Sequence, residues 1–471
     1  MSQALAYFFG YSPVVLLFVA AALVPVLAVG LAVGRPAVPV FAYIVVLFSF
    51  TQTSYGALEA ESTIYSRGTG QLFFSLLAWT LIGLVVAMSF RTQWSGKKPI
   101  ATNLGIPFML LALLFAGNLM VAAVLGIEMT QVLSNNGFVN LLFMGLFVFV
   151  MVRSMGQRVY LVWFERLLLI VGTLRAGFGL ARWVALGGDT SNVYENVEHL
   201  GIKITYFDIC DSMIAGVVLL YCLRRLFADW RSLRVLYRIF LASLIAMELA
   251  VIVLSYRRTA WGGLGLVLLF FFFLLPYRQK IVPLVAMPLV AIPIWLLGSQ
   301  RLGNAVAGQS FFGMFVYDIY SKNNFVGESP RTLELKAAFR TFLDNPIFGT
   351  GAWGHYQAVN GISWQAGPDA FSFVHSGVLH ILLKTGLVGM AIVVSAIFLY
   401  VRFVIRARGV VSERDRWLFD ASVAGLIFMI PDFMLGTPVP QFRTMLLYGV
   451  MIALPYLIAG IGVRERLTAA P

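Results

Sequence analysis

The stretch FVHSGVLHILLKTGLVG, residues 373–389, places imidazoles at the start of an apolar segment. The chain has four histidines, and two of them, His375 and His380, lie here. An imidazole has a pKa near neutrality, which suits it to act as a general base. His375 follows a glycine-rich segment, so we predict that it is the catalytic base. His380 would lie about 140° further round a helix and is predicted to be structural. His355 is a weaker candidate for the base.

Arginines accompany His375 on one side of the predicted membrane. Arg257 and Arg258 are adjacent, in VLSYRRTAWGG, where two apolar segments meet. A guanidinium is permanently charged, and its fork of N–H groups matches phosphate oxygens. We predict an anion site made by Arg257, Arg258 and Arg331, with Arg340 and Arg301 as secondary candidates. For the adjacent pair, the alternative is that two side chains snorkel to the membrane surface.

Arg175 lies inside an apolar segment, residues 160–186. An arginine at this depth is costly unless it faces a polar cavity, so it is a secondary functional candidate. The alternative is a structural ion pair with Glu248 or Asp208. Asp208 and Asp211 lack a third metal ligand, and carboxylates at a helix start complement the helix dipole. We therefore favour the helix-start role for the two aspartates and predict no metal site.

The elements that must position these side chains are apolar. Hydrophobic residues make up 60% of the chain, charged residues only 12%, and the mean hydropathy is +0.87. Soluble domains carry about twice that charged fraction. Many segments reach about 20 apolar residues, enough for a helix to cross a bilayer and too long for barrel strands. We predict an all-α, polytopic membrane protein with about 12–13 transmembrane helices. The predicted spans are 13–33, 37–53, 71–90, 105–125, 137–153, 160–186, 207–223, 235–255, 259–276, 280–299, 373–401, 417–435 and 439–462.

The net charge of +13 is distributed unevenly between the two sides of the predicted membrane. Most basic residues fall in the loops on one side of the predicted spans, which the positive-inside rule assigns to the cytoplasm. The excess charge is then a topology signal and an attraction to anionic lipid. It does not indicate nucleic acid as a partner. This orientation places His375 on the side opposite the cytoplasm.

The chain is predicted to form a single polytopic domain, 1–471, with one large structured loop. This loop, residues 300–372, precedes the span that starts near residue 373. Its length far exceeds what a connector needs, which is typical of a functional or disordered loop. Its many aromatic residues argue against disorder.

One helix is expected inside this loop, in SPRTLELKAAFRTFLDNP. Pro330 suits the first helical position, and Asn345–Pro346 ends the pattern. Leu335, Phe339 and Phe342 are predicted to form its apolar face, so the helix should lie on the outer membrane surface. Its polar residues are Arg331, Glu334, Lys336 and Arg340.

These motifs occur in an order that resembles a known family. The pattern Asn345-Pro346-x-Phe348-Gly349-x-Gly351 follows Arg331, and His375 and Lys384-x-Gly386-x-x-Gly389 come next. The order resembles that of the O-antigen ligase and polymerase superfamily of bacterial membrane glycosyltransferases, over residues 255–390. That family usually has Asn after the histidine. Here Ser376 stands in its place, and its hydroxyl can also donate or accept a hydrogen bond.

The resemblance implies a metal-independent, inverting glycosyltransferase without a cofactor. Its donor would be an undecaprenyl-diphosphate-linked glycan and its acceptor a glycan or a lipid. It would work on the periplasmic face of the bacterial inner membrane, among membrane lipids and with a chain-length regulator or flippase as a possible partner. His375 matches the base of the family, and Arg331 with Arg257 or Arg258 matches its diphosphate contacts. We favour a polymerase of repeat units, with a ligase to lipid A-core or protein as the alternative.

Two other classes fit the topology. A transporter or flippase of lipid-linked sugars would use intramembrane charges to line its path, and it predicts broken helices and charges near the midplane. A non-catalytic membrane scaffold needs only the spans. Neither class explains why the arginines and His375 gather on one side of the membrane, and we therefore favour the enzyme.

Overall fold

The structure, a computed structural model, describes the chain in segments. They are residues 34–50, 64–65, 74–95, 104–134, 137–186, 197–199, 202–204, 209–255, 257–281, 283–284, 288, 290–296, 330–357 and 370–469. The predicted span 13–33, Arg301 and Asp208 lie outside these segments, as does part of the predicted span 280–299.

The described segments are almost entirely helical, as predicted. Most of the predicted spans correspond to a helix that begins close to the expected residue. The helices are α3 (Ala37–Ser49), α5 (Leu76–Ser95), α6 (Gly105–Val124), α7 (Met129–Val132), α8 (Val139–Ser154), α9 (Arg158–Leu186), α10 (Ile209–Asp229), α11 (Val235–Leu254), α12 (Arg258–Leu274), α15 (Pro330–Asp344), α16 (Gly377–Arg408), α17 (Glu413–Phe428), α18 (Ile430–Leu435) and α19 (Phe442–Ala469). Short 3₁₀ turns occupy Tyr277–Gln279 and Ala370–Ser372.

Two short strands depart from a purely helical fold. β1 (Val197–His199) and β2 (Ile202–Ile204) pair antiparallel, with Val197 opposite Ile204. They lie in the connection between α9 and α10. Residues this close in sequence pair in a hairpin at little loop-closure cost.

Several helices have the length and composition of membrane spans. Among the described residues, α6, α11, α16, α17 with α18, and α19 are long and apolar enough to cross a membrane, and α3, α5, α8 and α12 are shorter apolar helices. The bilayer core offers no hydrogen-bond partners to the backbone, and a helix pairs its backbone groups within itself. The prediction of an all-α, polytopic membrane protein is confirmed.

α10 is the central helix of the bundle. Every residue from Ile209 to Cys222 is buried, and the helix contacts α9, α11, α12 and α17. Glycines allow close packing around it: a Cβ on Gly216 or on Gly263 would collide with Phe428 of α17. Small residues at such crossings are typical of helix packing in membranes.

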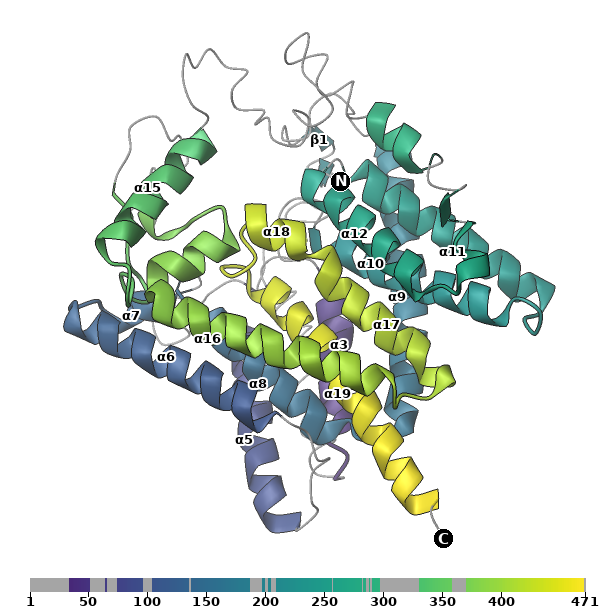
Figure 1. Ribbon diagram of the computed structural model, residues 1–471, viewed down its shortest axis with the longest axis horizontal. Helices are drawn as coiled ribbons and strands as arrows, with labels where there is room; N and C mark the ends of the chain where they lie inside the picture. The colour runs from purple at the N-terminus through teal and green to yellow at the C-terminus, as the bar shows by residue number, and fades with distance from the viewer. Residues whose placement is uncertain are drawn as a thin grey trace.

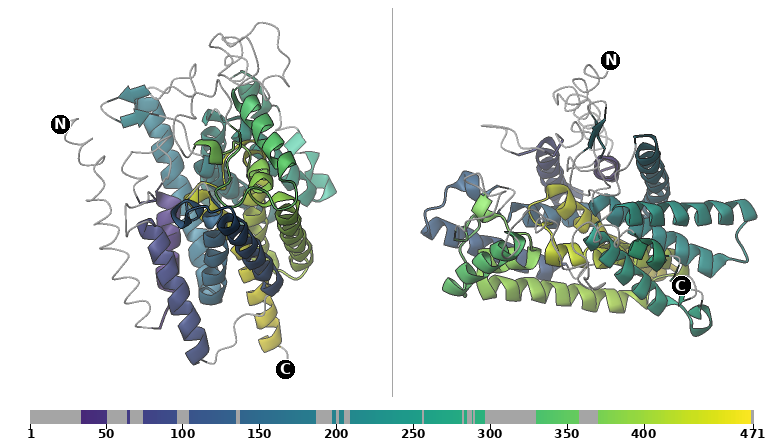
Figure 2. Two further views of the ribbon diagram at one scale, coloured as in Figure 1. Left: turned by 90° about the vertical axis from the view of Figure 1, so that its left-hand side faces the viewer. Right: turned by 90° about the horizontal axis from the view of Figure 1, so that it is seen from above.

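The two ends of the bundle differ. α15 stands beside the first turns of α16, at the end that also carries the β1–β2 hairpin, and the C-terminus lies at the opposite end (Figures 1 and 2). We call these the α15 end and the C-terminal end.

The buried face of α15 differs from the prediction. Its start at Pro330 and its end before Asn345 are as expected, and Phe342 is buried. Phe339, however, is exposed, whereas Glu334 and the small residue Ala338 are fully buried. Periodicity identifies the bulky apolar stripe of a helix, but here the buried face is the one that contacts α16.

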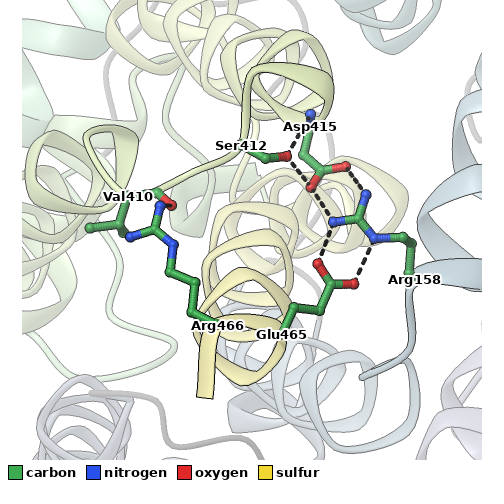
Figure 3. Close-up of polar contacts among 6 residues, drawn as sticks. All are labelled: Arg158, Val410, Ser412, Asp415, Glu465 and Arg466. Atoms are coloured by element: carbon green, nitrogen blue, oxygen red, sulfur yellow. Dashed lines mark hydrogen bonds and ion pairs between the residues drawn. The ribbon is translucent and has the colours of Figure 1, made fainter. Parts of the chain in front are cut away.

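A cluster of charges ties three helices together at the C-terminal end. The guanidinium of Arg158, at the start of α9, donates to Glu465 of α19 at 2.6 and 2.7 Å and to Asp415 of α17 at 3.0 and 3.2 Å (Figure 3). Asp415 also accepts from Ser412, the N-cap of α17, at 2.7 Å. One planar fork thus serves two carboxylates, which a lysine ammonium cannot do with the same geometry.

We expect Arg158→Ala to lower the free energy of unfolding by about 1.5–3 kcal/mol, the range for hydrogen bonds to charged groups. Arg416→Ala is the matched control, because the Arg416–Glu413 pair spans one helix turn at an exposed carboxylate and should contribute less than about 1 kcal/mol. Thermal unfolding of the detergent-solubilised protein measures both. Equal losses in the two variants would contradict the role given to Arg158.

Candidate functional site

The glycine motif after α15 docks into a break in α16. α16 loses helical geometry at Gly386, where φ is 63° and ψ is −163°. The carbonyls of Leu383 and Lys384 would normally accept from the amides of Leu387 and Val388. Here they accept instead from the loop amides of Thr350 at 2.8 Å and Gly351 at 3.1 Å.

The exchange also runs in the other direction. The amides of Leu387 and Val388 donate to the loop carbonyls of Pro346 at 2.8 Å and Ile347 at 3.1 Å. The loop therefore replaces four partners that the broken helix turn has lost. In a membrane protein this matters, because an unsatisfied backbone group away from water costs several kcal/mol.

The glycines of the motif follow from this close approach. Gly349 has φ 69°, and a Cβ there would lie 2.6 Å from the carbonyl oxygen of Leu383. A Cβ on Gly386 would lie 2.3 Å from the carbonyl oxygen of Ile347. Both positions combine positive φ with backbone contact, so only glycine fits.

Two polar side chains fix the docked loop. The Lys384 ammonium, fully buried, donates to the carbonyl of Gly354 at 2.6 Å and lies 5.9 Å from the ring centre of Trp353. The Asn118 amide of α6 donates to the Lys384 carbonyl at 2.8 Å. His380, one turn before Lys384, is buried against Phe138, in keeping with its predicted structural role.

This docking brings α15 against the start of α16, where Glu334 meets His375. The carboxylate Oε2 of Glu334 lies 2.7 Å from His375 Nδ1 and 3.3 Å from the His375 amide nitrogen. The Tyr356 hydroxyl donates to Oε1 at 3.3 Å. Glu334 is fully buried, whereas the His375 side chain is 20% exposed.

The contacts assign the tautomer of His375. A group that receives hydrogen bonds from a hydroxyl and an amide on its two oxygens has the environment of a carboxylate, which only accepts. A Glu334 carboxylate can only accept, which corresponds to the tautomer in which His375 Nδ1 donates to Oε2. In this tautomer Nε2 carries no proton and is the ring nitrogen that can accept one, since Nδ1–H is engaged by Glu334.

His375 itself precedes α16. Ser376 is the N-cap of the helix, and its hydroxyl accepts from the amide of Leu379 at 3.3 Å. The secondary candidate Ser376 thus has a structural task, which fixes the backbone next to His375. The ring of Phe373 packs edge-on against the imidazole, with centres 4.8 Å apart.

The predicted arginines lie on two elements, α15 and the start of α12. Arg331 is three residues before Glu334 on α15 and therefore shares its face. Arg257 is the N-cap of α12 and Arg258 its first residue. α18 contacts both α12 and α16. Helix α18 packs between the start of α12, which carries Arg257 and Arg258, and the first turn of α16, which follows His375.

The other candidates lie elsewhere. Arg340 is exposed and lies about 180° from Arg331 around α15. His355 is exposed beside Trp353, with ring centres 5.9 Å apart. Arg175 pairs with Asp211, Nη2 to Oδ2 at 2.8 Å, and also donates to the carbonyl of Ser49. Of the two predicted partners, Glu248 was wrong, because Asp211 in the first turn of α10 reaches the guanidinium. Asp208 lies outside the described residues.

Glu334 is the residue that the sequence reasoning did not single out. It was counted among the polar residues of a surface helix. Its spacing could have identified it as a site residue, because an acid three residues after Arg331 lies on the same helix face as that arginine. Only the docking of α15 shows that this face is buried against His375. Among the described residues, no group of three or more His, Cys, Asp or Glu side chains is arranged to hold a metal ion.

A comparison with protein families covers this part of the chain. Residues 239–394 match the sequence model of the O-antigen ligase family. The candidate site lies within this matched segment. No curated protein matches the chain. The matched O-antigen ligase segment contains Arg257, Arg258, Arg331, Glu334 and His375, and it confirms the resemblance to the ligase and polymerase superfamily. It supports a membrane enzyme that transfers glycosyl groups.

We expect Gly386→Ala to destabilise the protein by more than about 1–2 kcal/mol, the cost of placing an L-residue in the left-handed region, because the methyl group also meets the Ile347 carbonyl. Gly265→Ala in α12 is the control: its Cβ would meet nothing within 4 Å, and the change should stay within about 0.5 kcal/mol of neutral or stabilise the helix. Thermal unfolding in detergent compares the two. If both variants melt alike, the loop does not depend on the helix break.

Proposed function

We propose that the protein polymerises oligosaccharide repeat units that are carried on undecaprenyl diphosphate, with His375 as the general base. The observation that carries the proposal is the buried contact of Glu334 with His375 Nδ1 at 2.7 Å. A buried carboxylate that orients an imidazole is the arrangement that prepares a histidine to accept a proton at its other nitrogen.

The reaction would proceed as a single displacement. His375 Nε2 removes the proton of an acceptor sugar hydroxyl as its oxygen attacks the anomeric carbon of the donor. The bond between that carbon and the diphosphate oxygen breaks, and the lipid diphosphate leaves with the electron pair. Attack from the opposite side inverts the anomeric configuration. Glu334 stabilises the imidazolium that forms.

The arginines would stabilise the leaving group. Negative charge develops on the diphosphate as the glycosidic bond breaks, and fixed cations aimed at that charge lower the barrier. Arg331 on α15, with Arg257 or Arg258 at the start of α12, supplies permanently charged forks for phosphate oxygens. This chemistry needs no metal ion, so the activity should persist in a chelator.

The periplasmic face of a bacterial inner membrane is the proposed location. The basic loops assign the opposite end to the cytoplasm by the positive-inside rule. The lipid of the donor would lie among the outer ends of the helices, with a chain-length regulator or flippase as a functional partner. A ligase that moves the glycan to lipid A-core or protein shares the donor chemistry and differs in its acceptor.

Transfer from a lipid-diphosphate-linked oligosaccharide in detergent, with EDTA present, tests the proposal. We expect His375→Ala to lower the rate by about 10²–10⁴-fold, the usual contribution of a general base. His355→Ala is the control, because it removes an exposed histidine from the docked loop and should leave the rate unchanged. A ladder of product sizes indicates polymerisation, and a single product indicates a ligase. Full activity of His375→Ala would refute the mechanism.

Glu334→Gln keeps the shape of the side chain and removes its charge. We expect kcat to fall by about 10-fold or more with KM little changed, because the orientation of the imidazole matters in the transition state. The pH dependence of kcat should also shift, which a purely structural loss would not produce. An unchanged pH profile with a raised KM would assign Glu334 to substrate binding instead.

A further inference from the structure

Helices α9, α10 and α11 lie on the far side of the bundle from α15 (Figure 1). A second polar site is lined by residues of these three helices. It is a cleft of about 400 Å³, counting the part open to the surroundings. Arg175, Asp211 and Glu248 line it together with apolar residues and glycines. The transfer mechanism uses none of these three side chains.

Glu248 is the unusual member of this cleft. It is 2% exposed, and its Oε1 atom has no hydrogen-bond partner within the described part of the chain. Asp211, by contrast, accepts from Arg175 at 2.8 and 2.9 Å and lies 3.6 Å from Arg443. A buried carboxyl without a donor is unfavourable, because its desolvation is not repaid. A ligand that donates hydrogen bonds would satisfy it.

The depth of the cleft indicates where that ligand comes from. Asp211 lies about 3 Å from the start of α10, and Glu248 about 9 Å before the end of α11, at 1.5 Å per residue. Both lie near the end at which α12 begins with Arg258. Both therefore lie in the outer third of their helices, nearer to the polar lipid headgroups at that surface than to the centre of the bilayer.

The rim of the cleft is apolar and faces outward. Phe178, which lines it, is 52% exposed, and Leu174, one turn earlier on α9, is 66% exposed. Large apolar side chains exposed on a membrane-spanning bundle are in contact with acyl chains. A molecule in the cleft therefore has acyl chains beside it, as a bound lipid would.

We propose that this cleft binds the primary ammonium of a zwitterionic membrane lipid, with Glu248 as its partner. The carboxylate supplies the acceptor and the negative charge, and an ammonium offers three N–H donors in the volume of a water molecule. The lipid phosphate remains outside with the acyl chains. The site is independent of the glycosyl transfer at His375.

Lipids that differ only in their N–H donors test this proposal. The delipidated full-length protein is titrated in detergent with phosphatidylethanolamine, phosphatidylcholine or phosphatidylglycerol of the same acyl chains, and binding is followed by native mass spectrometry and by the shift in melting temperature. We expect the wild type to bind phosphatidylethanolamine at least about tenfold more tightly than phosphatidylcholine, since a buried charge pair is being completed. Equal binding of these two, or preference for phosphatidylglycerol, would overturn the proposal.

Glu248→Gln should abolish the preference for phosphatidylethanolamine while leaving the weak binding of phosphatidylcholine unchanged. Glu128→Gln, at an exposed position between α6 and α7, is the matched control and should keep the preference. A Glu248→Gln protein that still selects phosphatidylethanolamine would show that another group binds the ammonium. The comparison of lipids on the wild type remains decisive if the variant folds poorly.

Discussion

The exchange of hydrogen bonds between α16 and the loop after α15 is the constraint on which the site depends. A helix inside a bundle cannot break without leaving amides and carbonyls unpaired. Here the break at Gly386 is compensated by the loop from Pro346 to Gly351, which supplies both donors and acceptors. Neither element can keep its conformation without the other. The buried Lys384 and Asn118 add side-chain contacts to the same junction.

The proposed chemistry follows from this junction. Because the loop is fixed to α16, α15 is fixed as well, and its Glu334 meets the histidine that precedes α16. The acid comes from one element and the base from another, separated by 41 residues. Their relative position thus depends on backbone hydrogen bonds a few residues away, which are stiffer than long side chains. Preorganisation of this kind favours the transition state, since it leaves little to rearrange during the reaction.

Charged side chains have other roles elsewhere in the bundle. At the C-terminal end, Arg158 links α9, α17 and α19 through paired carboxylates, which stabilises helix positions. Near the other end, Arg175 and Asp211 form a satisfied pair, whereas Glu248 beside them is not satisfied. A buried polar group without a partner calls for an explanation, and the proposed ligand supplies one for Glu248.

The sequence by itself determined the class of the fold and the approximate positions of most described helices, and it indicated His375 as a candidate base. Long apolar segments allow only helices in a bilayer, and the glycine motif with His375 indicated the family. Sequence periodicity failed at α15, where burial follows contact with α16 rather than apolar bulk, so Phe339 is exposed and Glu334 is buried. It also could not choose among acids for Arg175, because residues one turn apart on a helix share a face. The tertiary structure alone decided which acid meets His375, because that contact joins two elements that only the docked loop brings together.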